Sequence, residues 1–97
     1  MKQKTLNSLV MREERQADGN YYVYELMVRE GARTADFGLS LYSIRISMTD
    51  KSGLCSQREA TDVFTNPERA IEFFNKLVNN LATPIDLVYV IEDEIWS

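Results

Sequence analysis

The spacing of apolar residues changes once along this 97-residue chain, near Phe64, and that change limits the folds the chain can adopt. Before Phe64, apolar and polar side chains alternate, which is the two-residue period of a half-buried β-strand. After it, apolar residues recur at intervals of three and four, which is the period of an amphipathic helix. A block of strands followed by a block of helices predicts an α+β fold.

Four strands are expected before Phe64, at about residues 4–14, 20–30, 36–49 and 54–63. The segments between them are short and rich in turn residues, and Asp18-Gly19 supplies the positive φ angles of a tight hairpin. Because short connections usually join neighbouring strands, the simplest topology is an antiparallel meander. The fourth strand is the most polar, as expected of a sheet edge.

The two sides of the second strand differ in charge. The uncharged side is expected to face the core and carries Tyr22, Tyr24, Leu26 and Val28. The other side carries three apolar residues among charged ones, Tyr21, Val23 and Met27, with Leu9 or Met11 alongside on the first strand. Such apolar side chains on an open sheet face, rimmed by charges, predict a contact surface for a second copy of the chain or for another protein.

The third strand changes phase, because Phe37, Leu39 and Leu41 alternate in one register and Tyr42, Ile44, Ile46 and Met48 in the other. We predict a β-bulge near Leu41 and Tyr42, which would keep both sets on one face. The alternative is a strand whose two halves face different cores, which a chain this short disfavours.

A helix is predicted over about residues 66–81, with an apolar face that can lie on the sheet. Its start is indicated either by a capping box of Thr65 and Glu68, or by Asn66 as the cap followed by Pro67.

The last segment, Leu87 to Ile91, is five consecutive apolar residues, which strand propensity favours. The preceding Thr83-Pro84-x-Asp86 is instead a helix start, and it places Leu87 or Val88, Ile91 and Ile95 on one helical face. We favour the helix. On a helix, Glu92, Asp93 and Glu94 diverge and cannot converge on one metal ion.

Composition excludes several kinds of chemistry. The chain has no histidine, which removes histidine-based catalysis and zinc binding, and no phosphate-binding glycine motif. An enzyme using carboxylates or tyrosines remains open. Cys55, the single cysteine, is expected to be a buried or half-buried apolar residue. We therefore expect a non-enzymatic protein without cofactor or metal.

Charge and hydropathy limit the partners. The net charge is −4 and the pI about 4.8, which argues against nucleic acid, although four arginines, Arg12, Arg15, Arg29 and Arg45, could form a local basic patch beside the tyrosines. No apolar run approaches the length of a membrane span or a signal peptide, so a cytoplasmic location is expected.

The segment Leu81 to Asp93, with the helix from Thr65 before it and the polar front of four strands, resembles an uncharacterised domain-of-unknown-function family of short proteins from Gram-positive anaerobes. The resemblance implies a cytoplasmic ββββαα protein and no functional residues.

The sequence thus predicts a single α+β domain over residues 1–97, with a sheet in 1–64 and a helical layer in 65–97. Its form is a four-stranded antiparallel meander followed by two helices packed on one face. The expected function is protein interaction or regulation, with Tyr21, Val23 and Met27 as the interaction face. The alternative is a small-ligand-binding domain whose pocket lies between sheet and helices, lined by Tyr22, Tyr24 and Phe74.

Overall fold

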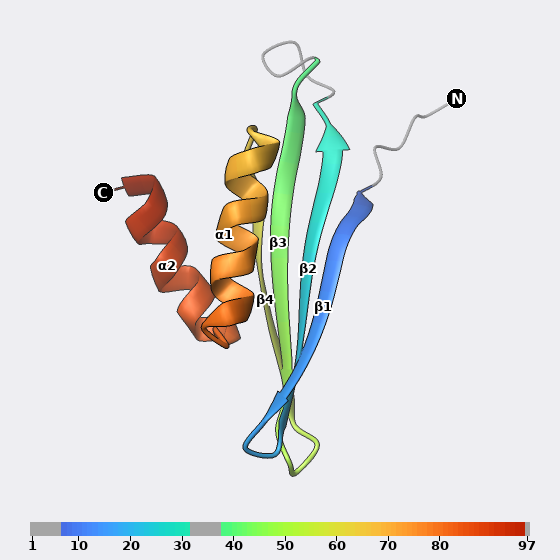
Figure 1. Ribbon diagram of the computed structural model, residues 1–97, viewed down its shortest axis with the longest axis vertical. Helices are drawn as coiled ribbons and strands as arrows, with labels where there is room; N and C mark the ends of the chain where they lie inside the picture. Colours follow the sequence, from blue (N-terminus) through green and yellow to red (C-terminus); the bar gives the residue numbers. More distant parts are fainter. Residues whose placement is uncertain (1–6, 32–37, 97) are drawn as a thin grey trace.

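A computed structural model of the protein describes residues 7–31 and 38–96 (Figure 1). Four strands come first, β1 (Ser8–Ala17), β2 (Asn20–Glu30), β3 (Ser40–Thr49) and β4 (Cys55–Phe64), and two helices follow, α1 (Pro67–Asn79) and α2 (Pro84–Trp96). The strands form one antiparallel sheet in the order β1-β2-β3-β4. The predicted ββββαα meander is therefore confirmed.

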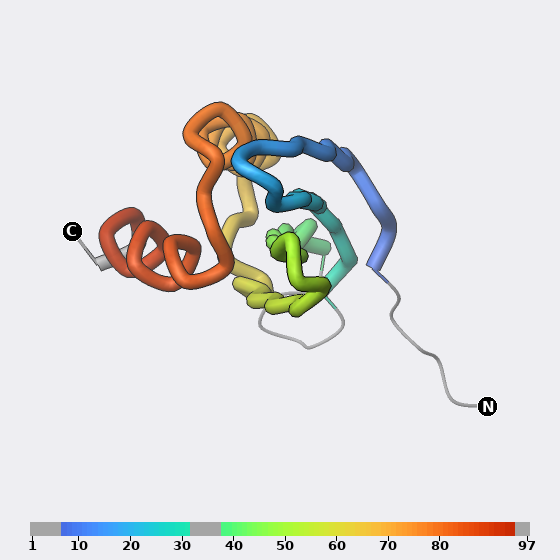
Figure 2. The backbone as a smooth tube through the Cα atoms, turned by 90° about the horizontal axis from the view of Figure 1, so that it is seen from below, coloured from blue at the N-terminus to red at the C-terminus, as the bar shows by residue number. Residues whose placement is uncertain are grey.

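Both helices pack on the same face of the sheet, and α2 lies farther out than α1, on the side of β4 (Figures 1 and 2). The core between sheet and helices contains Tyr22, Tyr24 and Leu26 of β2, Ile44 and Ile46 of β3, Phe64 of β4, Phe73, Phe74, Leu77 and Val78 of α1, and Leu87 of α2. The predicted core side of β2 is confirmed, with Val28 half-buried at its end. Neither helix of the described residues covers the opposite face of the sheet.

The strand bounds differ from the prediction mainly at the N-terminal ends. β2 begins and ends as predicted, and β4 is displaced by one residue. β1 ends at Ala17 rather than at position 14, since pairing with β2 continues to the hairpin turn. Positions 4–6 and 36–37 lie outside the described residues.

The predicted bulge in β3 is wrong in its placement. The pairing of β2 with β3 is unbroken from Tyr21 opposite Thr49 to Glu30 opposite Ser40, so Leu41 faces away from the helices. The register changes instead between β3 and β4, where Tyr42 pairs with Phe64 and Ile44 with Ala60, and the extra residues are in β4. Leu41 therefore lies on the face opposite the helices, whereas Ile44 and Ile46 face the helices, and the core cluster of the described residues does not include Leu41.

Asp62 lies at the centre of the β4 irregularity, with φ of +54°, a left-handed conformation that Asp tolerates better than most residues. Its backbone N–H donates to the hydroxyl of buried Ser43 at 2.8 Å. Its carboxylate accepts from Arg29 at 3.1 and 2.5 Å. These partners replace the ladder hydrogen bonds that an irregular strand loses.

Both helix starts are set by local chemistry. Asn66 caps α1, since its side-chain oxygen accepts from the backbone N–H of Arg69 at 3.0 Å, and Pro67 follows at the first position. At α2, the Thr83 hydroxyl accepts from the N–H of Asp86 at 3.2 Å, and the Asp86 carboxylate accepts from the N–H of Thr83 at 3.0 Å. This reciprocal capping box fixes the last segment as a helix and rules out the strand.

Candidate interaction surfaces

The three residues predicted as an interaction face all lie on the open face of the sheet, and they differ in exposure. Tyr21 and Val23 are half-buried, whereas Met27 is only 6% exposed. Leu9 pairs with Met27 and shares its face, while Met11 packs against the core on the other side. This surface is therefore less apolar and less accessible than a two-residue period alone suggests.

Charged residues lie at the centre of the open face, and they pair with one another. Arg45 on β3 donates to Glu25 on β2 at 2.9 Å and lies 3.7 Å from Glu59 on β4. The hydrogen bond with Glu25 holds the pKa of Arg45 above its usual value. The three side chains form a row across three strands at the centre of the face, and each acid neutralises part of the same guanidinium.

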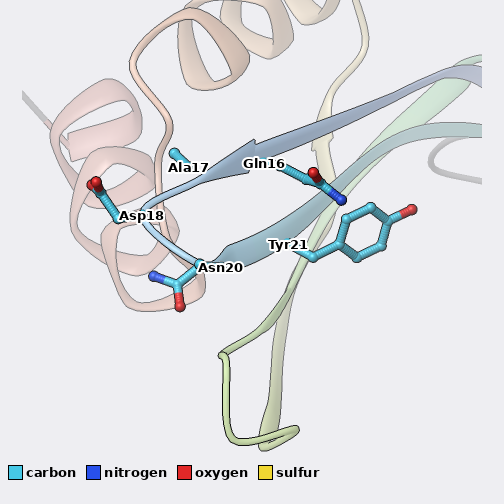
Figure 3. Close-up of a pocket in the computed structure, with 6 residues that line it drawn as sticks. Gln16, Ala17, Asp18, Asn20 and Tyr21 are labelled. Carbon is cyan, nitrogen blue, oxygen red and sulfur yellow. The ribbon is translucent and has the colours of Figure 1, made fainter.

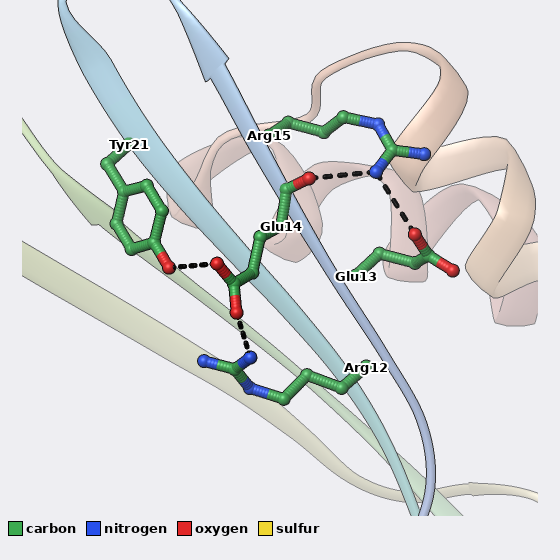
Figure 4. A network of polar contacts seen from close by, with 5 residues as sticks. All are labelled: Arg12, Glu13, Glu14, Arg15 and Tyr21. Atoms are coloured by element: carbon green, nitrogen blue, oxygen red, sulfur yellow. Dashed lines mark hydrogen bonds and ion pairs between the residues drawn. The ribbon is translucent and has the colours of Figure 1, made fainter.

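A second polar group lies on β1 and β2 near the hairpin (Figure 4). The Tyr21 hydroxyl donates to Glu14 at 2.5 Å, and Arg12 donates to the other oxygen of the same carboxylate. The hydrogen bond from Tyr21, followed by that from Arg12, lowers the pKa of Glu14, and the bond to Glu14 raises the pKa of Tyr21. On the other side of β1, Arg15 pairs with Glu13 at 3.0 Å.

The four arginines of the suspected basic patch thus each have a carboxylate partner, in Arg12–Glu14, Arg15–Glu13, Arg29–Asp62 and Arg45–Glu25. A phosphate backbone would have to compete with these internal acids for every guanidinium.

The β1–β2 hairpin forms an open hollow of about 330 Å³, lined by residues 16–21 (Figure 3). Asp18 and Gly19 turn the chain with φ angles of +54° and +83°, the positive pair that a two-residue hairpin requires. The lining side chains shown in Figure 3 point in different directions and do not converge on one position. The hollow therefore follows from the shape of the hairpin and offers no set of ligand-binding groups.

The residues predicted to line a small-ligand pocket are packed in the core. Tyr22 is 7% exposed, and Tyr24 and Phe74 are fully buried. The Tyr24 hydroxyl donates to the backbone carbonyl of Ala82 at 2.8 Å, so its polar atom is used within the protein. Tyr22 stacks beside Tyr24 with ring centroids 6.2 Å apart. These three side chains therefore belong to the packed core of the described residues.

The acidic run at the end of α2 diverges as predicted. Glu94 binds Arg69 of α1 at 3.0 Å, whereas Glu92 is exposed to solvent. Within residues 7–31 and 38–96, no group of three metal-ligating side chains comes together. The expectation for Cys55 is wrong, because the residue opens edge strand β4 and its side chain is exposed.

Three large exposed apolar side chains lie together on α2, where the sequence predicted no site. Ile85 is 60% exposed, Val88 46% and Tyr89 65%. Their spacing of three and four puts them on one face, opposite buried Leu87. We call this set the α2 outer face. The uninterrupted apolar run Leu87 to Ile91 could have indicated an exposed apolar face, because such a run covers more than one side of a helix.

A small apolar hollow of about 200 Å³ adjoins this face at the start of α2. Met48, Ser56 and Arg58 line it from the sheet, and Thr83, Pro84 and Ile85 from the helix. The Arg58 guanidinium donates to the Gln57 carbonyl at 2.8 Å and has no carboxylate partner among the described residues. The α2 outer face thus has a cation at its N-terminal end.

The helices of the described segments, 7–31 and 38–96, include none that is long and apolar enough to cross a membrane. In comparisons with known proteins, a model described as a family of unknown function, DUF6514, matches residues 2–97. No curated protein and no solved structure matches the chain.

Proposed function

The chain belongs to DUF6514, a family of unknown function, and from the geometry we propose that it is a non-enzymatic protein-interaction or regulatory domain that binds through the α2 outer face. The observation that carries this proposal is the exposure of Ile85, Val88 and Tyr89 in one stripe. Large apolar side chains gathered on one face of a helix are typical of a docking surface.

The energy available from this face is modest. Burying a large apolar side chain completely contributes about 1.5–3 kcal/mol, and these three are already partly covered, so each offers roughly 1–2 kcal/mol. The sum is comparable with the translational and rotational cost of association, so the stripe must be joined by polar contacts at its rim. This predicts a weak, reversible contact.

We prefer the α2 outer face to the sheet face of Tyr21, Val23 and Met27, because Met27 is buried there and the neighbouring charges are internally paired. The same pairing supports a non-enzymatic role, since Arg45, Glu25 and Glu59 engage one another at the centre of that face. It also speaks against nucleic acid as the partner.

The family resemblance adds two further parts to the proposal, a cytoplasmic location and a source among Gram-positive anaerobes. Fractionation of such a cell expressing the tagged chain tests the location, and recovery in the membrane pellet would contradict it.

In-cell crosslinking tests the proposed surface. A photo-crosslinking amino acid at position 89 should give a discrete crosslinked species, and the same group at Asn79, exposed on α1, should not. Introducing Val88→Asp should abolish the species while leaving the fold intact, because Val88 is outside the core. Equal crosslinking from positions 89 and 79 would refute the assignment of the surface.

A further inference from the structure

The α2 outer face carries opposite charges at its two ends. Glu92 follows Val88 and Tyr89 by four and three residues, so it extends the stripe towards the C-terminus, and it is exposed. At the N-terminal end, Arg58 of β4 shares the 200 Å³ hollow with Ile85. Neither charge has an ion-pair partner among the described residues. The stripe is therefore apolar in the middle, positive at one end and negative at the other.

The helix itself increases this polarity. A helix is electrically positive at its N-terminus and negative at its C-terminus, so acids are unfavourable in the last turn. α2 has no basic residue in its last turn, and three acids follow one another there. Arg69 of α1 pairs with Glu94, and no ion pair of Glu92 forms within the described residues. A positively charged group of a binding partner would thus be stabilised next to Glu92.

We infer that the α2 outer face binds the same face of a second copy of the chain, with the two helices antiparallel about a two-fold axis. This inference rests on the proposed function and names its partner. The observation that selects a second copy is self-complementarity, because only an antiparallel copy presents a matching stripe with its charges reversed end to end.

The spacing fits such a pairing. With Val88 at the centre, Ile85 lies about 4.5 Å before it along the helix axis and Glu92 about 6 Å after it. Glu92 of one copy therefore lies at nearly the same level as Ile85 of the other, beside Arg58. At the centre of the interface, Val88 and Tyr89 of one copy pack against Val88 and Tyr89 of the other. Two ion pairs form in each dimer, one at either end.

The full-length protein should show a concentration-dependent monomer–dimer equilibrium in sedimentation, with a dissociation constant of about 10⁻⁵ M for an interface this small. Arg58→Glu and Glu92→Arg should each weaken it about tenfold, because each places like charges together at both ends. Mixing the two variants should restore the affinity to about the wild-type value, since in the mixed dimer both ends again hold opposite charges.

Two matched variants control for net charge. Lys51→Glu and Glu30→Arg make the same charge changes at exposed positions outside both helices, and they should leave the equilibrium unchanged. Thermal melts of all variants, recorded well below the dissociation constant where each is monomeric, should coincide and show that the fold is retained.

Failure of recovery in the mixture overturns the antiparallel pairing. A monomer at all concentrations, together with a crosslink from position 89 to a different protein, overturns the second copy and leaves the proposed function standing. A monomer without any crosslink from position 89 overturns both.

Discussion

Removing the Tyr24 hydroxyl should have opposite effects on stability at neutral and at alkaline pH. Tyr24 is fully buried, and its hydroxyl donates to the carbonyl of Ala82 at 2.8 Å, which ties β2 to the connection between the helices. In Tyr24→Phe this carbonyl loses its partner. We expect the free energy of unfolding at pH 7 to fall by about 1–2 kcal/mol, the usual cost of a lost buried hydrogen bond.

The alkaline effect follows from the pKa of the same group. Burial raises the pKa of Tyr24 from 10.0 to about 12, so between these values the folded protein keeps a proton that the unfolded chain has released. The wild-type stability from this group is therefore complete below pH 10 and is lost as the pH rises towards 12. Two pKa units correspond to about 2.7 kcal/mol. Tyr24→Phe escapes this loss, so the two stability curves should cross near pH 11.

Urea unfolding followed by circular dichroism, at intervals from pH 7 to pH 12, measures both effects. Tyr22→Phe is the matched control, because Tyr22 is 7% exposed in the same core and no hydrogen bond from its hydroxyl forms within the described residues. Its difference from wild type should be small at pH 7. A Tyr24→Phe difference that stays constant from pH 7 to pH 12 would refute the reasoning on burial.

Four further outcomes are expected. Met27→Asp should lower the free energy of unfolding in urea by about 3 kcal/mol or more, because it buries a charge, whereas Val23→Asp at a half-buried position should cost clearly less. Hydrogen bonds from Ser52 and Leu54 lower the pKa of Asp50, so its contribution is present above pH 3.8 and lost in stronger acid, and acid titration of Asp50→Asn should lack that part of the loss. Truncation after Ala82 removes buried Leu87 and should give a molten species with exposed apolar surface, detected by dye binding. Millimolar Mg²⁺ or Zn²⁺ should leave the melting temperature nearly unchanged, and a rise of several degrees would reveal a site.

Elements with local signals could be predicted from the sequence. The cap and first position of each helix, Asn66-Pro67 and Thr83-Pro84, lie next to each other in the chain, and their hydrogen bonds close within three residues. For that reason cap chemistry correctly outweighed the strand propensity of the five apolar residues that follow Asp86. The meander followed similarly from short turns between strands.

The two faces of β2 were predicted correctly, but the position of the irregularity depends on the pairing of β3 with β4, and there the prediction was wrong. Leu41 and Met27 are both buried on the face of the sheet opposite the helices. The core between sheet and helices lies on the other face. The irregularity that the phase change indicated is in β4, where Asp62 can adopt a left-handed conformation and find partners. Nothing within β3 reveals that its neighbour absorbs the extra residues.

The candidate interaction surface moved from the sheet face to α2, because the exposure of a side chain depends on its neighbours in the folded protein. The sequence of the second strand shows Tyr21 and Val23 next to charged residues. It does not show that the oppositely charged partners of those residues lie on β1, β3 and β4. Once Arg45 lies between Glu25 and Glu59, the open face is largely neutralised by itself. A contact at this face would have to compete with these internal ion pairs.

α2 differs from the open face in this respect. The helix needs one apolar side to pack on β3 and β4, and Leu87 supplies the buried centre of that side. Ile85, Val88 and Tyr89 add a second apolar side that contributes little to the core, since none of them belongs to it. A solvent-facing helix surface is normally polar, and Lys, Glu or Arg at these positions would favour the helix equally well without exposing apolar area. The fold alone therefore gives no reason for these three residues, whereas a contact that buries them does.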